Sequence, residues 1–237
     1  MIMKVDVLDH GFVRLVDHMG GDLSVARAAR VSYDADWRAG TDTGSDDRLI
    51  RYLWRNHHTS PFEAVQFTFE VKAPIFVVRQ WHRHRTWSYN EVSARYTELP
   101  EEYYVPTPEI IGVQSKNNKQ ARVISAKGSQ EFNTIQGTNE FASDMIGDLC
   151  QTAFQNYHAL LKLGVPRELA RTVLPLATYT RMFATVDLLN LFKFLTLRLH
   201  EHAQYEIRVY AQAMLELIRP HVPVCVAAWE EGNGQAG

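Results

Sequence analysis

Cysteine is scarce in this 237-residue chain, and long apolar runs are missing. The two cysteines, Cys150 and Cys225, are too few for a disulfide framework or a thiolate zinc site. No segment reaches the ~18 apolar residues of a membrane-spanning helix, and the amino-terminal Met-Ile-Met-Lys-Val-Asp lacks the apolar run of a signal peptide. These absences predict a cytoplasmic protein.

An excess of basic charge is also missing. The formal net charge is −2 and the sequence pI is about 6.6, which argues against a general nucleic-acid-binding protein. Hydrophobic residues make up 46% and charged residues 22% of the chain, both ordinary for a globular protein. The length is ample for burying a core.

Glycine-rich phosphate-binding loops are not available either. The sequence contains no Walker A loop, and its one G-x-G-x-x-G stretch lies at residues 232–237. Because the chain ends there, no helix can follow to present its backbone amides to a pyrophosphate. We expect residues 231–237 to form a flexible tail, so that side chains elsewhere must hold any nucleotide.

Periodic segments that are present predict short strands and longer helices. Residues 64–72 alternate apolar and polar side chains, which is typical of a strand, and Pro74 then opens a helix that ends near Arg83. Further strands are expected at 4–7, from 12 and at 178–186, and further helices at 140–163, 188–199 and 203–218. Together they predict a single α+β domain over residues 1–237, with short strands packed on long helices.

Other segments have little periodicity or only capping signals. We expect residues 34–47 to be a mobile loop and residues of about 110–140 to be an irregular excursion or a lid. A short helix should follow Gly20-Gly21, with Asp22 or Ser24 as its cap. Ser60 and Glu63 flank Pro61 with the spacing of a capping box, which is a structural explanation for both.

Positive charge is concentrated in residues 79–96. This window holds four arginines and one acid, Glu91, so its formal charge is +3 in a chain of net −2. Guanidinium groups bind phosphate or carboxylate through paired hydrogen bonds, and Ser88 and Ser93 add short polar groups that orient a ligand. Trp81 and Trp87 lie between the charges, so flat rings can share the site. The structural alternative is a solvated basic face over a few core aromatic residues.

The same window resembles the signature of the flavin-dependent thymidylate synthases at nine specified positions in fourteen, Arg83-His84-Arg85-x-x-Ser88-x-Asn90-Glu91-x-Ser93-x-Arg95-Tyr96. The resemblance extends through Arg27-x-x-Arg30-Val31-Ser32, His58-x-Ser60-Pro61-Phe62-Glu63, Val165-Pro166-Arg167-Glu168-x-Ala170-Arg171 and His202-Ala203-Gln204. Only residues 34–47 and about 110–140 look unrelated.

The resemblance implies an enzyme that makes dTMP from dUMP. It implies bound FAD, 5,10-methylenetetrahydrofolate as carbon donor and NADPH as reductant, in a homotetramer whose active sites are shared between subunits. The flavin is expected to do the hard chemistry while the protein supplies orientation and charge stabilisation, without an enzyme nucleophile. Ser93 is therefore expected to hydrogen-bond the substrate. No membrane or nucleic-acid partner is expected.

The resemblance also implies roles for single residues. Arg198 is expected to promote loss of the uracil N3 proton, and His58 to lie at the flavin where the folate and NADPH chemistry occurs. The expected dUMP-binding residues are Gln80, Trp81, His82, Arg83, Glu91, Ser93, Arg95, Arg171 and Arg198. The expected FAD-binding residues are Ser60, Arg83, His84, Arg85, Glu91, Asp187, Leu189 and Lys193.

Three of these positions depart from the family pattern. Some members have asparagine near position 187 and asparagine or histidine near 193, where this chain has Asp187 and Lys193. Both side chains can still hydrogen-bond a ribose or a pyrophosphate. Position 189 is sometimes arginine, so any contact made by Leu189 must use its backbone.

Two other classes of function stay open. One is a catalytically inactive nucleotide- or RNA-binding protein that stacks bases on Trp81 and Trp87. The other is a metal-dependent hydrolase built on the pairs His82-x-His84 and His200-x-His202. Positions two apart diverge on a helix, so neither pair makes a good chelate there, and we expect no metal.

Overall fold

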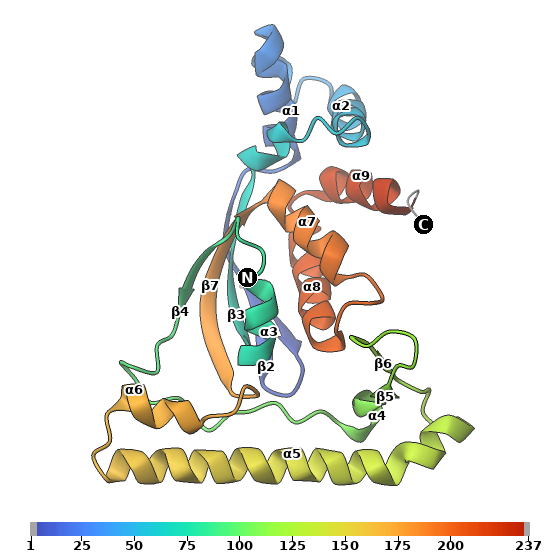
Figure 1. The fold of residues 1–237 in the computed structure, drawn as a ribbon. Coiled ribbons are helices and arrows are strands. Elements are labelled where there is room, and N and C mark those ends of the chain that lie inside the picture. Colours follow the sequence, from blue (N-terminus) through green and yellow to red (C-terminus); the bar gives the residue numbers. More distant parts are fainter. Residues whose placement is uncertain (1–3, 235–237) are drawn as a thin grey trace.

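A five-stranded antiparallel sheet forms the centre of the protein (Figure 1). The computed structural model describes residues 4–234. In sheet order the strands are β1 (Lys4–Val7), β2 (Gly11–Met19), β3 (Gln66–Pro74), β7 (Tyr179–Asp187) and β4 (Ser88–Glu91). In the described part of the chain, no helix is long and apolar enough to cross a membrane.

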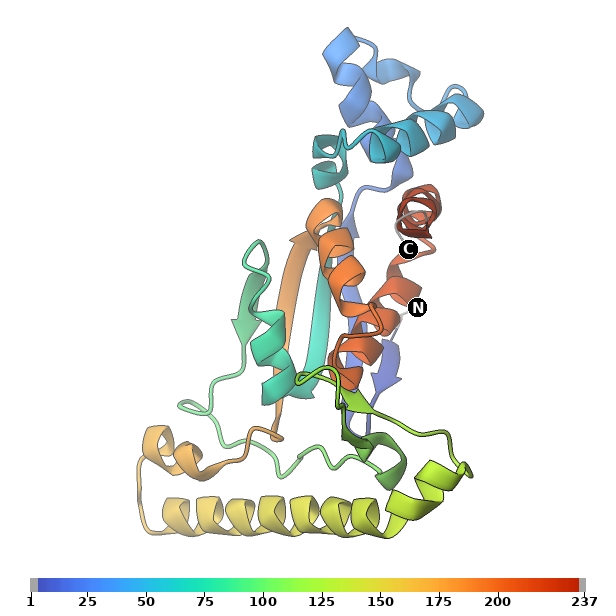
Figure 2. The ribbon, with the colours of Figure 1, turned by 45° about the vertical axis from the view of Figure 1, so that its right-hand side comes forward.

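The predicted strand at 64–72 is confirmed as β3, and its alternation decides which face of the sheet is buried. Phe67, Phe69 and Val71 are 0% exposed and belong to the main core. Three helices that contribute to this core cover the sheet, as Figures 1 and 2 show: α3 (Ile75–Trp81), α7 (Leu188–Arg198) and α8 (Tyr205–Ile218). The α+β class predicted from the sequence is confirmed.

A 33-residue helix, α5 (Gln130–Lys162), crosses the base of the molecule (Figure 1). Ser129 caps it by accepting a hydrogen bond from the Phe132 amide at 3.1 Å. Gly164, at φ +80°, follows its carboxyl end and takes a conformation that side chains disfavour. Next come α6 (Arg167–Ala170) and the 3₁₀ helix η4 (Arg171–Val173).

Two helices near the amino terminus stand beyond the far end of the sheet, α1 (Asp22–Arg30) and α2 (Thr43–Arg55). An ion pair between Arg30 and the buried Asp46 holds them together. Short 3₁₀ helices lie between and after them: η1 (Val31–Tyr33), η2 (Asp36–Arg38) and η3 (Ser60–Ala64).

The predicted flexible tail is wrong for residues 231–234. A further helix, α9 (Pro223–Gly234), includes residues 231–234 of the expected flexible tail, and residues 235–237 lie outside the described part. Asp22 of α1 accepts the amide hydrogens of Val224 and Cys225 at 3.0 Å each, which caps this helix from a segment about 200 residues away in the chain. Such a cap leaves no local sequence signal.

Other local predictions also need correction. The stretch of about 110–140 contains α4 (Pro108–Ile111), the hairpin β5 (Val113–Gln114) and β6 (Arg122–Val123), and the first turns of α5. Helix α2 begins at Thr43, inside the expected loop at 34–47. No strand is predicted between Arg83 and residue 178, but residues 88–91 form strand β4, because pairing with β7 imposes an extended backbone.

Two expected caps are not formed. Gly21 is the N-cap of α1, and its amide donates to the Ser24 hydroxyl at 3.2 Å, so neither Asp22 nor Ser24 takes that position. At Pro61 the segment forms a 3₁₀ helix with Thr59 as N-cap and no side-chain capping bond. The hydroxyl of Ser60 and the carboxylate of Glu63 are therefore not used for capping.

Candidate active site

The arginine-rich window is delivered by α3 and the tight loop that follows it. Pro74 ends β3 and is the N-cap of α3, whose last residue is Trp81. The Tyr89 hydroxyl on β4 reaches back and shares its one proton between the carbonyl oxygens of Trp81 and His84, at 3.2 and 3.0 Å. Burial raises the pKa of Tyr89, so the phenol stays protonated and can donate. The loop carrying Arg83 is thus fixed at both ends.

Arg198, at the end of α7, meets this loop. Its Nε donates to Nε2 of His84 at 3.1 Å, and one of its terminal nitrogens donates to the Gln80 carbonyl oxygen at 3.1 Å. His84 and Arg198 are 114 positions apart in the chain. The guanidinium is half-buried, and its burial lowers the pKa of Arg198 from the ordinary value. Arg198 is therefore held in a defined orientation.

His84 is kept neutral in this pair. Burial, and then the neighbouring Arg198 guanidinium, lower the pKa of His84 from 6.5 to about 4. Because Nε2 accepts the hydrogen bond from Arg198, the imidazole must carry its proton on Nδ1. Protonation of Nε2 would break the bond that orients Arg198.

We expect the pair to make stability depend on pH. Between pH 6.5 and about 4 the unfolded chain binds a proton at His84 that the folded chain does not bind, so the free energy of unfolding falls as the pH falls. The expected loss over this window is about 2 kcal/mol, allowing for solvent screening of a half-buried ring. Urea unfolding at several pH values measures it. His84→Gln should flatten the profile, and His57→Gln reports the effect of losing an exposed histidine. An unchanged profile in His84→Gln would contradict this account.

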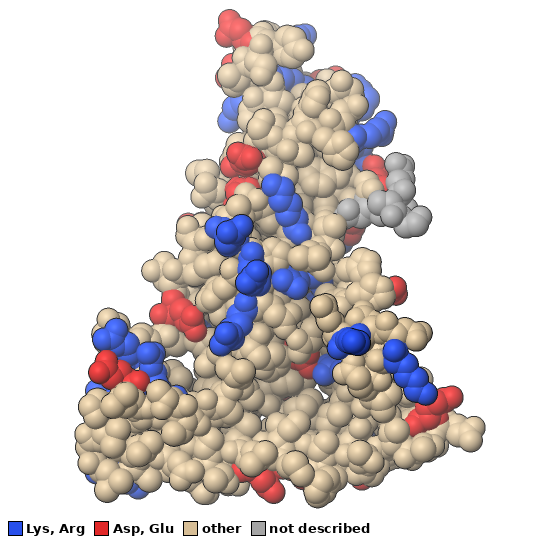
Figure 3. Space-filling view, viewed as in Figure 1, with Lys and Arg blue, Asp and Glu red and all other residues tan. Residues whose placement is uncertain are grey.

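Most of the other guanidinium groups are exposed and uncompensated. Arg95 pairs with Glu168 of α6 at 3.4 Å, with both side chains more than half exposed. Among residues 4–234, no acidic partner pairs with Arg79, Arg83, Arg85 or Arg171. Figure 3 shows basic side chains gathered on the face over α3 and β4. Such a surface attracts an anion and retains the donors to bind it.

The structure gives defined partners to three other predicted site residues, Glu91, Ser93 and His82. The Glu91 carboxylate, on β4, accepts a hydrogen bond from the Thr180 hydroxyl at 2.7 Å. The Ser93 hydroxyl oxygen accepts one from the Arg95 amide at 3.3 Å, which leaves the hydroxyl proton able to donate to a ligand. His82 is exposed and packs edge-on against Tyr89, with ring centroids 4.6 Å apart.

Asn190 forms hydrogen bonds with Asp187 and Lys193, two of the residues expected to contact the flavin. Asp187 caps the helix as predicted, accepting from the Asn190 amide at 2.9 Å. The Asn190 side chain donates to the other oxygen of Asp187 at 2.6 Å and accepts from Lys193 at 3.3 Å. Leu189 is buried, so the expectation that any contact there uses the backbone stays a prediction.

Trp81 is a core residue of the fold, so the predicted dUMP contact at this position stays a prediction for its backbone alone. Its side chain is 0% exposed and stacks on Phe194, with ring centroids 4.9 Å apart, so it is a core residue and cannot contact a ligand at the surface. A side-chain contact of the site was missed: Gln204, at the start of α8, accepts a hydrogen bond from the Gln80 side chain. The His202-Ala203-Gln204 match contained a signal for it, but no role was assigned.

His58 and Ser60 lie in a different hollow. This hollow has a volume of about 830 Å³ and is lined by α1, α2 and the residues on either side of His58. The exposed His58 ring lies edge-on to Tyr52 at 6.0 Å. The lining contains no residue of α3 or α7, so one subunit does not place His58 and Arg198 in the same cavity.

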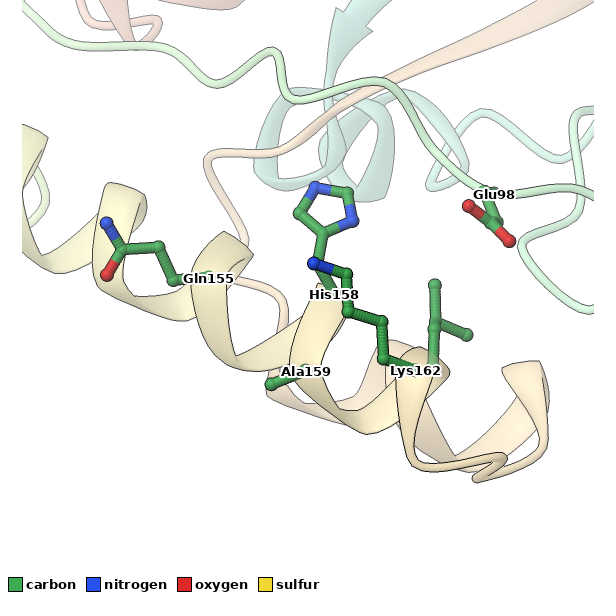
Figure 4. A pocket seen from close by; sticks show the side chains of 6 residues that line it. Glu98, Gln155, His158, Ala159 and Lys162 are labelled. Atoms are coloured by element: carbon green, nitrogen blue, oxygen red, sulfur yellow. The ribbon is translucent and has the colours of Figure 1, made fainter.

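Another hollow, of about 670 Å³, lies on the carboxyl-terminal half of α5 (Figure 4). His158 and Lys162 extend from the helix, and Glu98 faces them from the neighbouring segment. His158 also pairs with Glu101 at 3.6 Å. None of the predicted site residues lines this hollow, so it is separate from the candidate site.

The fold and site define an α+β protein with an exposed cluster of arginines beside a guanidinium fixed by two hydrogen bonds. The model of the protein family described as "Thymidylate synthase complementing protein" matches residues 14–224 of this chain. A flavin-dependent thymidylate synthase of Thermus thermophilus is 50% identical over 230 residues, covering 97% of this chain and 79% of the relative. One from Treponema denticola is 47% identical over 237 residues, covering 99% and 85%. The chain belongs to the flavin-dependent thymidylate synthase family.

A solved structure agrees with this assignment. The crystal structure of a UMP/dUMP methylase, PolB from Streptomyces cacaoi bound with 5-Br dUMP, superposes with a TM-score of 0.80. It is 36% identical in sequence, and the match covers 97% of this chain and 99% of PolB. The similarity therefore extends over the whole fold.

Proposed function

We propose that this enzyme methylates dUMP to dTMP, with FAD as cofactor, 5,10-methylenetetrahydrofolate as carbon donor and NADPH as reductant. The observation that carries the proposal is the set of uncompensated arginines beside the Arg198–His84 pair. A nucleotide monophosphate offers both an anion for the arginines and a ring for the fixed guanidinium.

The phosphate of dUMP would be bound by Arg83, Arg95 and Arg171. The exposed Arg95–Glu168 ion pair is weak, because solvent screens it, and it can open to admit a phosphate. Ser93 and Gln80 then supply neutral donors for the sugar and base. His82 and Glu91 stay proposed dUMP contacts at the edge of this surface.

Arg198 would act on the uracil ring. A guanidinium stabilises the anion left at N3 without being a proton donor at neutral pH, and a preorganised charge lowers the barrier more than a mobile one. The neutral His84 and the Gln80 carbonyl accept two hydrogen bonds from the guanidinium, and its other N–H groups would bind the uracil ring. His84 is therefore a positioning group as well as a proposed flavin contact.

The residues present fit a flavin dinucleotide. Arg83 and Arg85 are exposed cations, and the Ser60 hydroxyl is not used for capping, so donors are available for a pyrophosphate and a ribose. Asp187 and Lys193, joined by Asn190, add an acceptor and a cation. Glu91 and the backbone at Leu189 are the other proposed contacts. When bound, the flavin supplies the one-carbon and hydride chemistry.

Assembly of subunits would bring the two parts of the site together. His58 lines the 830 Å³ hollow, whose lining includes nothing from α3 or α7, and we propose that it meets Arg198 of another subunit in a homotetramer. The exposed Phe141, Met145 and Leu149, spaced by four residues on α5, offer an apolar surface for this assembly. Light scattering of the purified protein measures its mass.

The expected cytoplasmic location stays a prediction.

The first test is an absorbance spectrum of the purified protein. We expect a flavin band that NADPH bleaches under anaerobic conditions at a rate altered by dUMP, followed by dTMP formation when the folate is added. If no flavin band appears even after FAD is supplied, the cofactor assignment is overturned. Salt-dependent RNA binding without turnover would favour a nucleic-acid-binding function instead.

Ser93→Ala is expected to retain detectable turnover. Ser93 would only hydrogen-bond the substrate, so its loss should raise the KM for dUMP by about tenfold. The assay measures dTMP formation, with flavin absorbance as a control for loading. Complete inactivity with flavin and dUMP still bound would indicate that Ser93 takes part in the chemistry.

A further inference from the structure

Glu206 is a buried carboxylate that the proposed chemistry does not use. It lies in the first turn of α8 and is 1% exposed. One of its oxygens accepts hydrogen bonds from the Tyr104 hydroxyl at 3.1 Å and from Arg122 at 2.7 Å. A buried carboxylate is stable only with such partners, so the three side chains form one unit.

The unit joins three separate segments. Arg122 belongs to the hairpin β5–β6, which has only two pairs of facing residues and is too short to be stable alone. Tyr104 belongs to the segment after Pro100, and its amide donates to the Ala177 carbonyl at 3.0 Å. Figures 1 and 2 both place β6 beside the amino-terminal end of α8. The ion pair with Glu206 therefore fixes the hairpin.

The same end of α8 reaches the candidate active site. Gln204, two residues before Glu206, is the N-cap of α8 and accepts a hydrogen bond from the Gln80 side chain. The Gln80 carbonyl in turn accepts from Arg198 at 3.1 Å. A cavity of about 300 Å³ lies between the hairpin and the start of α8, with Arg122 and Gln204 both in its lining. The ion pair of the hairpin and the hydrogen bonds of Gln80 are thus connected through two residues of backbone at the start of α8.

We propose that Glu206 is a positioning residue for the dUMP contact made by Gln80. By holding Arg122 and Tyr104 against the first turn of α8, it fixes Gln204, and Gln204 fixes Gln80 beside the ligand. Glu206 itself touches no reacting atom. The inference rests on the proposed methylation of dUMP. It also implies that the hairpin restrains the first turn of α8.

Glu206→Gln tests the proposal because it removes the charge and keeps the side-chain volume. In the flavin-loaded enzyme, we expect the KM for dUMP to rise by about tenfold, with kcat changing by less than about threefold. Trypsin cleavage after the hairpin residues Lys116 and Lys119 should be faster by about tenfold, because the hairpin is released. Trypsin cleavage reports on the hairpin whether or not the protein methylates dUMP.

Glu70→Gln is the matched control. Glu70 on β3 is also a buried glutamate, 6% exposed, and pairs with Arg14 and Arg181, but within residues 4–234 no hydrogen bond or ion pair connects it to Gln204. We expect it to lower the free energy of unfolding without changing the KM or the hairpin cleavage rate. If Glu70→Gln raised the KM as much as Glu206→Gln does, general destabilisation would explain both and the proposal would fall.

The path through Gln204 is tested by combining variants. If Glu206 acts through Gln204, Glu206→Gln should raise the KM no further in a Gln204→Ala background. Additive effects would overturn this path, and faster hairpin cleavage with an unchanged KM would overturn the positioning role. If the parent enzyme fails to methylate dUMP, the proposed function and the positioning role both fall, and the cleavage rate alone decides whether Glu206 holds the hairpin.

Discussion

Replacing Arg198 with lysine is expected to lower kcat for dUMP methylation by about 10²- to 10³-fold. Lysine keeps the positive charge, but it has no planar fork, so it cannot bond His84 and the Gln80 carbonyl while also facing the ligand. The negative charge at uracil N3 would then be stabilised only by a mobile ammonium group, which must reorganise during the reaction. Rapid-quench measurement of dTMP formation separates the chemical step from product release.

Arg219→Lys is the control for this prediction. Arg219 also makes two side-chain hydrogen bonds, at 3.1 and 2.6 Å, to Glu230 on the surface beyond α8. We expect its kcat to equal that of the parent enzyme. Binding of dUMP to Arg198→Lys should weaken by much less than kcat falls, because the phosphate contacts are intact. A kcat within about threefold of the parent would show that Arg198 has no role in activating the ring.

Trp81→Ala should destabilise the fold by about 3–5 kcal/mol. The indole is 0% exposed and packs against Phe194, Trp87 and Tyr210, with ring centroids 4.9, 5.8 and 6.1 Å away. Its removal leaves a cavity between α3, α7 and α8 that these rings cannot fill without losing their own contacts. Urea unfolding measures the change in the free energy of unfolding.

Trp37→Ala is the matched control for Trp81, because its side chain is 71% exposed. We expect its effect on stability to stay within about 0.5 kcal/mol. The comparison separates the core role of Trp81 from the ligand contact expected from the sequence. If Trp81→Ala left stability unchanged and raised only the KM for dUMP, the indole would have to be a ligand contact after all.

Predictions based on near neighbours in the chain mostly succeeded. The alternation in β3 and the proline that ends it both identify local structure, and Asp187 caps α7 as its position before an apolar helix indicates. Each of these features is decided by side chains within a few residues of one another. The capping box at Ser60 failed because its four-residue pattern also suits a 3₁₀ turn.

Predictions that depended on packing were less successful. Strand β4 has no clear alternation, and only its pairing with β7 makes it extended. The first turns of α5 have few apolar residues in register, so the sequence from 130 to 140 looked irregular although Ser129 caps a helix there. Helix α9 needed a cap from Asp22, which no local pattern reveals.

The sequence by itself determined the family and the chemistry of the arginine-rich window, because both depend on residue types. It also determined most of the strands and helices around this window, because local periodicity indicates them. Only the tertiary structure decided which of these residues touch. It buried Trp81 in the core, gave Arg83 and Arg85 no acidic partner within the described chain, and brought His84 and Arg198 together across 114 positions. Such contacts depend on how the helices pack on the sheet, and packing is a property of the whole chain.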